Sequence, residues 1–275
     1  MTTTAVRVRG LAKRYGDVQA VGGIDLDVHA GEVFAILGPN GAGKSTTVEI
    51  LEGYRRRDAG EVSVLGVDPG RPTRAWRSRV GVVLQTAGDM TEATVRETVR
   101  HFAGFYPDAE DPDEVIERVG LADKAGKRIR ELSGGQRRRV DVALGVIGRP
   151  ELLFLDEPTT GFDPEARRRF WDLVRGLAHR GTTIVLTTHY LDEAEALADR
   201  VAVIAKGRIV AEGEPATLGG RATAAATVRW AGGSVETDNP TETVLELSRR
   251  FGGEIPELTV TRPSLEETYL RLIEG

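Results

Sequence analysis

The sequence predicts an α/β protein with a mostly parallel sheet that helices cover on both faces. Two observations lead to this fold class. Short apolar, β-branched runs alternate with longer helical stretches through the first two-thirds of the chain, and one of these runs leads through a glycine-rich loop directly into a helix. With 275 residues, of which 40% are hydrophobic, the chain is long enough to bury a sizeable core.

The individual elements follow from the spacing of apolar residues along the chain. The predicted strands of the main sheet are residues 28–37, 79–84, 152–155, 182–187 and 201–204. The predicted helices are residues 44–52, 94–106, 113–119, 135–147, 164–179 and 191–198. Because strands and helices alternate, we expect successive strands to lie parallel, joined by helical crossovers.

Two segments depart from this alternation. Within residues 85–149 helical stretches follow one another without a strand between them, which predicts an inserted helical subdomain. Short strand-like runs at residues 5–9, 23–28 and 61–65 have no crossover helices. These runs predict an antiparallel β patch beside the main sheet.

The character of the chain changes after about residue 213. An Ala/Thr-rich, strand-like run ends at Trp230, and a last helix begins at Ser264. We therefore expect a first domain of residues 1–215 and a small C-terminal α+β extension, an accessory domain of residues 216–275.

Composition excludes several classes of protein. The absence of cysteine rules out a disulfide framework and a thiolate metal site, and four scattered histidines leave little for a His-rich metal cluster. The longest apolar runs are far shorter than the roughly 20 residues that cross a bilayer, and the start of the chain lacks the apolar core of a secretory signal. The net charge of −5 argues against a general nucleic-acid surface. We therefore expect a cytoplasmic protein without a nucleic-acid partner.

The glycine-rich loop carries the strongest functional motif. It follows a strand and opens a helix, which is the context in which successive backbone N–H groups cradle phosphate oxygens. Lys44 would bridge the β- and γ-phosphates, Ser45 would supply an oxygen to Mg²⁺ and Thr46 would touch the α-phosphate. The loop reads Gly38, Pro39, Asn40, Gly41, Ala42, Gly43, Lys44, Ser45 and Thr46.

Two acids end the buried run at residues 152–155. At the carboxyl edge of a sheet, beside a phosphate loop, Asp156 can hold Mg²⁺ through water. Glu157 can then act as the general base that orients the attacking water. An isolated Asp-Glu pair would more simply be a solvated strand end, but the phosphate loop earlier in the chain favours the catalytic interpretation.

A third motif reads Ser133, Gly134, Gly135 and Gln136 after Leu132. Alone it is weak, because the same residues form ordinary loops and helix N-caps. Its position between the phosphate loop and the acidic strand end is informative. With the motifs around it, residues 5–215 resemble the ATP-binding cassette (ABC) ATPases, which have a P-loop NTPase core.

The resemblance implies further roles in binding ATP and Mg²⁺. Tyr15 would stack on adenine, although packing within the antiparallel patch is an equally good interpretation for a lone aromatic residue. Gln85 would reach Mg²⁺ and the attacking water, and its loop would meet a transmembrane partner. Asp163 would couple two sites across a dimer, and His189 would hydrogen-bond the γ-phosphate.

The resemblance also implies an assembly. Ser133 and Gly135 would contact the γ-phosphate bound by the other subunit, so two chains would form a nucleotide-dependent head-to-tail homodimer. Residues 263–270 resemble the ending of ATP-binding subunits of drug and antibiotic exporters, although they also form an ordinary helix start. This implies an ATPase on the inner face of the cell membrane that powers efflux through a separate permease. A soluble cassette ATPase working on ribosomes, cluster assembly or DNA repair remains the alternative.

Overall fold

The computed structural model describes residues 3–83 and 92–274. Its main sheet has the strand order β5-β6-β7-β3-β8-β9, in which all neighbours run parallel except the antiparallel pair β8 and β9. The mostly parallel sheet is thus confirmed, while β9 was not predicted. The strands are β3 (Val33–Leu37), β5 (Val80–Val83), β6 (Leu152–Asp156), β7 (Thr183–Thr188), β8 (Arg200–Ala205) and β9 (Arg208–Gly213).

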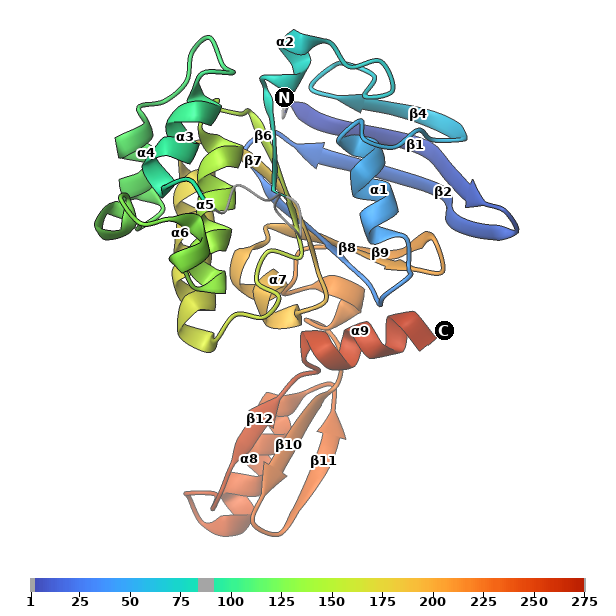
Figure 1. Ribbon diagram of the computed structural model, residues 1–275. Coiled ribbons are helices and arrows are strands. Elements are labelled where there is room, and N and C mark those ends of the chain that lie inside the picture. Colours follow the sequence, from blue (N-terminus) through green and yellow to red (C-terminus); the bar gives the residue numbers. More distant parts are fainter. Residues whose placement is uncertain (1–2, 84–91, 275) are drawn as a thin grey trace.

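A separate antiparallel sheet with the order β2-β1-β4 lies beside the main sheet, as predicted (Figure 1). Its strands β1 (Thr4–Tyr15), β2 (Val18–His29) and β4 (Ala59–Val64) are longer than or offset from the predicted runs. The predicted strand of residues 28–37 is wrong in one respect, because a turn divides it between β2 and β3. Gly31 in that turn has φ of +82°, a conformation that ends the extended run and favours glycine.

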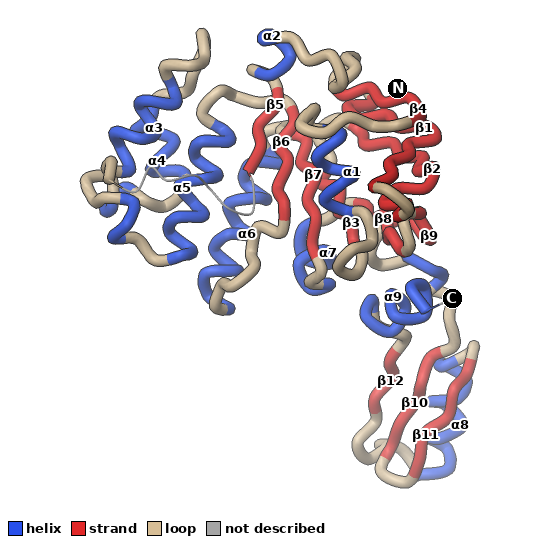
Figure 2. Tube along the Cα trace, turned by 45° about the vertical axis from the view of Figure 1, so that its right-hand side comes forward, coloured by secondary structure: helices blue, strands red, loops and turns tan. Residues whose placement is uncertain are grey.

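Helices cover both faces of the main sheet (Figure 2). All six predicted helices are present with slightly shifted ends, and the short α2 was not predicted. They are α1 (Lys44–Leu51), α2 (Arg74–Arg77), α3 (Val95–Ala103), α4 (Pro112–Arg118), α5 (Gly134–Val146), α6 (Pro164–His179) and α7 (Leu191–Leu197). Short 3-10 helices occur at η1 (Ala122–Lys124), η2 (Ile129–Glu131) and η3 (Leu218–Gly220).

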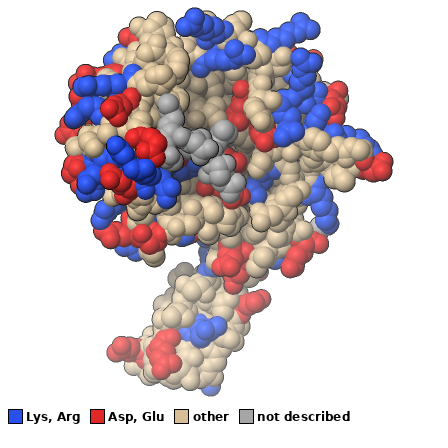
Figure 3. Space-filling view, viewed as in Figure 1, with Lys and Arg blue, Asp and Glu red and all other residues tan. Residues whose placement is uncertain are grey.

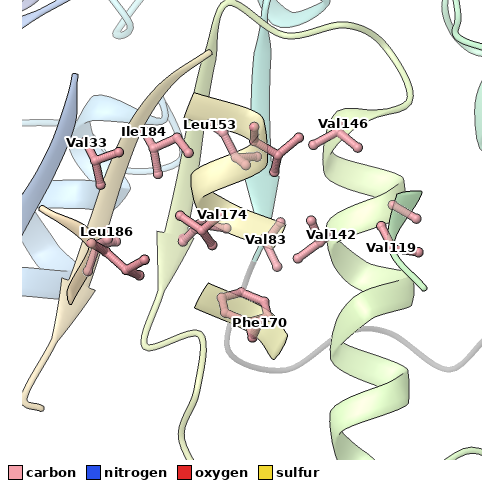
Figure 4. Packing of buried hydrophobic residues seen from close by; sticks show 14 of the residues in the cluster. Val33, Val83, Val119, Val142, Val146, Leu153, Phe170, Val174, Ile184 and Leu186 are labelled. Carbon is pink, nitrogen blue, oxygen red and sulfur yellow. The ribbon is translucent and has the colours of Figure 1, made fainter. Parts of the chain in front are cut away.

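Strand β3 divides its side chains between two hydrophobic clusters, because successive side chains of a strand point to opposite faces. Phe34 and Ile36 pack with α1 and the antiparallel sheet. Val33, Ala35 and Leu37 pack with the helices on the other face. Figure 4 shows part of this second cluster, where strand residues meet the helical side chains Val142, Val146, Phe170 and Val174. Packing on both faces therefore fixes the end of β3, where the following loop begins.

Helices α3, α4 and α5 occupy the predicted helical subdomain, and side chains cap the N-terminus of each. Thr94 forms a capping box with Glu97 at α3, and Asp111 accepts hydrogen bonds from the backbone N–H groups of Asp113 and Glu114 at α4. Ser133 caps α5. The boundaries 85–149 stay a prediction, since residues 84–91 lie outside the described part of the chain.

The C-terminal region contains a small sheet with the order β11-β10-β12 and helix α8 (Pro240–Phe251), around Val228, Leu247 and Ile255. The last helix, α9 (Leu265–Glu274), instead packs its Leu265 into the large helical cluster, beside Leu218. The division into residues 1–215 and 216–275 stays a prediction. By sequence α9 belongs to the second part, but its Leu265 packs in the core of the first. The strands are β10 (Ala226–Trp230), β11 (Gly233–Thr237) and β12 (Thr259–Thr261).

Among the residues that the structure describes, no helix is long and apolar enough to cross a membrane.

Candidate active site

The phosphate loop, residues 38–46, joins β3 to α1 in a space that only glycine fits at two positions. A Cβ atom on Gly38 would lie 2.3 Å from the carbonyl oxygen of Ile204, and one on Gly43 would lie 2.3 Å from that of Ala20. Gly43 also has φ of +104°. No side chain caps α1, so the N–H groups of its first turn remain available to an anion.

Lys44 opens α1 and folds its side chain back over the loop. Its Nζ donates hydrogen bonds to the carbonyl oxygens of Gly38 at 2.8 Å and Pro39 at 3.2 Å. Only 5% of the residue is exposed. Burial lowers the pKa of Lys44, and the negative charges of Glu157 and Asp156 oppose this shift. The ammonium group of Lys44 is thus held inside the phosphate loop by hydrogen bonds to that loop.

The two acids at the end of β6 are fixed by the neighbouring strand β7. Asp156 Oδ1 accepts a hydrogen bond from Thr187 Oγ1. The backbone N–H of Glu157 donates to both the carbonyl oxygen and the hydroxyl of Thr187, each at 3.1 Å. Glu157 has φ of +42°, a strained conformation for a non-glycine residue that costs about 1–3 kcal/mol and that tends to occur at functional sites.

The carboxylate of Glu157 lies between two other predicted catalytic residues. Its Oε1 is 3.9 Å from Lys44 Nζ, and its Oε2 is 3.5 Å from His189 Nδ1. The hydroxyl of Thr160 donates to the same Oε2 at 3.4 Å. The structure therefore brings Lys44, Glu157 and His189 together from three distant parts of the sequence.

The residues Ser133–Gln136 lie beside the first turn of α6. Ser133 accepts a hydrogen bond from the backbone N–H of Gln136, and Asp163 caps α6 by accepting from Ala166. A Cβ atom on Gly135 would lie 3.4 Å from the Cβ of Ala166. Within the described residues, no hydrogen bond or ion pair joins Ser133, Gly134, Gly135, Gln136 or Asp163 to Lys44, Glu157 or His189, so their roles stay predictions.

A further predicted residue, Tyr15, lies in the antiparallel sheet. Tyr15 ends β1, is 40% exposed, and has Lys13 Nζ 5.4 Å and the Arg55 guanidinium 5.3 Å from its ring centroid. An exposed ring of this kind can stack on a base, but stacking stays a prediction. Gln85 lies outside the described residues.

Comparison with known proteins shows the family. Residues 21–160 match the family described as ABC transporter, the ATP-binding cassette proteins. The chain belongs to this family. It is an ATPase, which binds ATP and hydrolyses it.

The similarity to individual proteins extends beyond residues 21–160. A daunorubicin resistance ATP-binding protein of Streptomyces coeruleorubidus is 40% identical, and the match covers 99% of this chain and 96% of that protein. A Nod factor export ATP-binding protein of Rhizobium sp. (strain N33) is 43% identical over 79% of this chain and 73% of that protein. A solved ATP-binding subunit of an ABC transporter has the same fold, with a TM-score of 0.73 at 23% identity over 98% of this chain and 99% of that one.

The cassette contains buried polar residues that the sequence analysis did not identify. Arg138 on α5 is 6% exposed and donates to the carbonyl oxygens of Asp156 at 2.8 Å and Pro158 at 3.2 Å. Glu193 on α7 is fully buried and accepts a hydrogen bond from Trp171 Nε1 at 3.3 Å. Arg138 ties the helix that follows Ser133 to the acidic strand end, and Glu193 ties the segment after His189 to α6.

A cavity of about 850 Å³ adjoins the cluster, between α1 and α2 on one side and α3 and α5 on the other. Its lining includes Ser45 and Asp156, together with Glu52 and Asp141. Burial, and then the nearby charges of Asp156 and Glu49, raise the pKa of Glu52 to about 8. Burial raises the pKa of Asp141 to about 6. In the sequence, Glu52 is only one polar residue at the end of a helix.

We expect Glu52→Gln to flatten the pH dependence of stability. Because the pKa of Glu52 is raised in the folded state, the folded protein binds more protons than the unfolded chain, and stability falls as the pH rises toward about 8. The free energy of unfolding of the variant should exceed that of the wild type by roughly 2–4 kcal/mol at about pH 8, and the two should differ little at about pH 5. Urea unfolding in EDTA would measure this, and a parallel loss of stability in both proteins would contradict it.

Proposed function

We propose that this ABC ATPase powers export through a separate membrane permease, with a drug-like or antibiotic molecule as the exported substrate. The convergence of Lys44 and His189 on the Glu157 carboxylate carries the catalytic part of the proposal. The named functions of the relatives in daunorubicin resistance and Nod factor export support the transport part. The protein would lie on the inner face of the cell membrane.

The residues present fit a bound Mg²⁺. The exposed hydroxyl of Ser45 and the carboxylate of Asp156 line the same cavity, and oxygen atoms of this kind are the ligands that Mg²⁺ prefers. Gln85, the third predicted ligand, lies outside the described residues. When bound, Mg²⁺ would neutralise charge on the β- and γ-phosphates.

The chain's own groups would position the reaction. The N–H groups at the start of α1 and the ammonium of Lys44 would bind the phosphates, which places the γ-phosphorus near Glu157. Glu157 would accept a proton from water as the water oxygen bonds to the γ-phosphorus and the bond to the β–γ bridging oxygen breaks. ADP and phosphate leave. His189, whose Nδ1 lies 3.5 Å from Glu157 Oε2, would orient this carboxylate and donate to the γ-phosphate.

We expect Ser133→Arg to abolish hydrolysis while ATP binding to the monomer stays close to that of the wild type. The proposed site is completed by Ser133 of a second chain, so an arginine there would block closure of the head-to-tail dimer without touching the phosphate loop of its own chain. Equilibrium binding of ATP and phosphate release should be measured side by side. Simultaneous loss of binding would argue against a site shared between chains.

The partner can be identified by crosslinking from the segment 85–95, which we propose contacts the permease. A photoreactive residue placed at Glu92, which is exposed and lies within this segment, would serve as the reporter in the described part of the chain. Capture of a polytopic membrane protein from gently solubilised membranes supports the export role. Capture of ribosomes or of DNA-repair proteins would favour the soluble alternative.

A further inference from the structure

The segment from Tyr54 to Arg79 has a charge opposite to that of the whole protein. It contains seven arginines and three carboxylates, a net charge of +4 within a chain whose net charge is −5. A segment with this much positive charge in an otherwise acidic protein creates a local positive electrostatic potential.

Part of this positive charge is neutralised within the fold. Arg55 pairs with Glu49, Arg57 with Asp68, and Arg79 with Glu151. Arg56, Arg74 and Arg77 are exposed and form no ion pair or side-chain hydrogen bond with any residue that the structure describes. These three guanidinium groups are directed to solvent.

The short helix α2 holds the backbone of two of these arginines in place. Trp76 is only 2% exposed, and its Nε1 donates to the carbonyl oxygen of Val64 at 2.8 Å. Thr73 caps the helix N-terminus. Because Arg74 and Arg77 are three residues apart on a helix, they lie on one side of it. Figure 3 shows Lys and Arg atoms gathered at the top of the view, over α2.

An exposed aromatic residue accompanies the arginines. Tyr54 is 79% exposed, and it lines the same cavity as Arg77. The opposite wall of that cavity contains Phe102 and Tyr106, at and after the end of α3. Arginines beside an exposed tyrosine are typical of surfaces that contact the headgroup region of a membrane.

We propose that Tyr54, Arg56, Arg74 and Arg77, here called the arginine face, contact the anionic phospholipid headgroups of the membrane. The inference rests on the proposed attachment to a permease. α3, which forms one wall of the cavity, directly follows the segment proposed to contact the permease, and a permease bound there would bring the arginine face close to the bilayer. Negative lipids complement its charge, whereas the net charge of −5 disfavours a long nucleic acid.

The test is sedimentation of the full chain with vesicles of phosphatidylcholine, with and without phosphatidylglycerol. We expect binding only to the vesicles that contain phosphatidylglycerol, and release at high salt. The triple variant Arg56→Glu, Arg74→Glu and Arg77→Glu should partition about 100-fold more weakly. The matched control Arg208→Glu, Arg249→Glu and Arg250→Glu changes the net charge equally at exposed arginines elsewhere and should retain most of the binding.

Three results would overturn the proposal: no binding of the wild type to anionic vesicles, equal loss in the two triple variants, or displacement of the protein from vesicles by double-stranded DNA. The ATPase rate of the control triple variant and of the double variant Arg56→Glu and Arg74→Glu should match that of the wild type, because these residues line neither the catalytic cluster nor the cavity beside it. If the wild type binds anionic vesicles but does not hydrolyse ATP, the proposed function fails, while the proposal that the arginine face binds anionic lipid stands.

Discussion

Replacing Glu157 by glutamine is expected to lower ATP hydrolysis by about 10² to 10⁴-fold, the usual contribution of general-base catalysis. Glutamine keeps the shape of the side chain and one oxygen beside Lys44 and His189, but it cannot accept the proton of the attacking water. Nucleotide binding should survive. Phosphate release over time, measured with saturating ATP and Mg²⁺, gives the rate.

Glu236→Gln is the matched control for this substitution, because Glu236 is an exposed residue of β11 in the C-terminal sheet. Its hydrolysis rate should equal that of the wild type. A Glu157→Gln protein that hydrolyses ATP at close to the wild-type rate would show that the role assigned to Glu157 is wrong.

Removing the ammonium group by Lys44→Ala should act on binding instead. The buried Nζ lies 3.9 Å from Glu157 Oε1 and can neutralise phosphate charge, and its loss also removes the hydrogen bonds that it donates to the carbonyl oxygens of Gly38 and Pro39. A hydrogen bond to a charged group contributes about 1.5–3 kcal/mol, so ATP affinity should fall about 10- to 100-fold. Calorimetric titration with ATP and Mg²⁺ would measure this.

Lys127→Ala is the matched control here, since Lys127 is exposed and its side chain has no hydrogen bond or ion pair within the described residues. Its affinity for ATP should not change. An unchanged affinity in Lys44→Ala would mean that the phosphates bind away from this loop.

The local features of this protein were predictable from its sequence. The phosphate loop depends on residues that are adjacent in the chain, and the parallel sheet follows from the alternation of strand and helix patterns. The loop and the acidic strand end therefore lie where the sequence placed them. The role of His189 at the γ-phosphate, by contrast, was expected only through resemblance to a family, and nothing in the local sequence specifies its proximity to Glu157.

The features that were missed depend on long-range packing. Strand β9 alternates half-buried and exposed residues and lacks a strong apolar pattern, and α2 has only four residues. The burial of Glu52 and Arg138 arises where α1 and α5 meet other elements. The final helix was predicted, but its packing on the large core through Leu265, rather than on the small sheet, is a tertiary property that helical periodicity does not encode.

The central claim is that ATP, held by the loop at Lys44, closes two chains around nucleotides that Glu157 then helps to hydrolyse. Size-exclusion chromatography with light scattering, in ATP and Mg²⁺, tests it most directly. Glu157→Gln should run at the mass of a dimer because it binds ATP without cleaving it, and Lys44→Ala should run as a monomer under the same conditions. A Glu157→Gln protein that stays monomeric with saturating ATP, or a Lys44→Ala protein that dimerises equally well, would contradict the account.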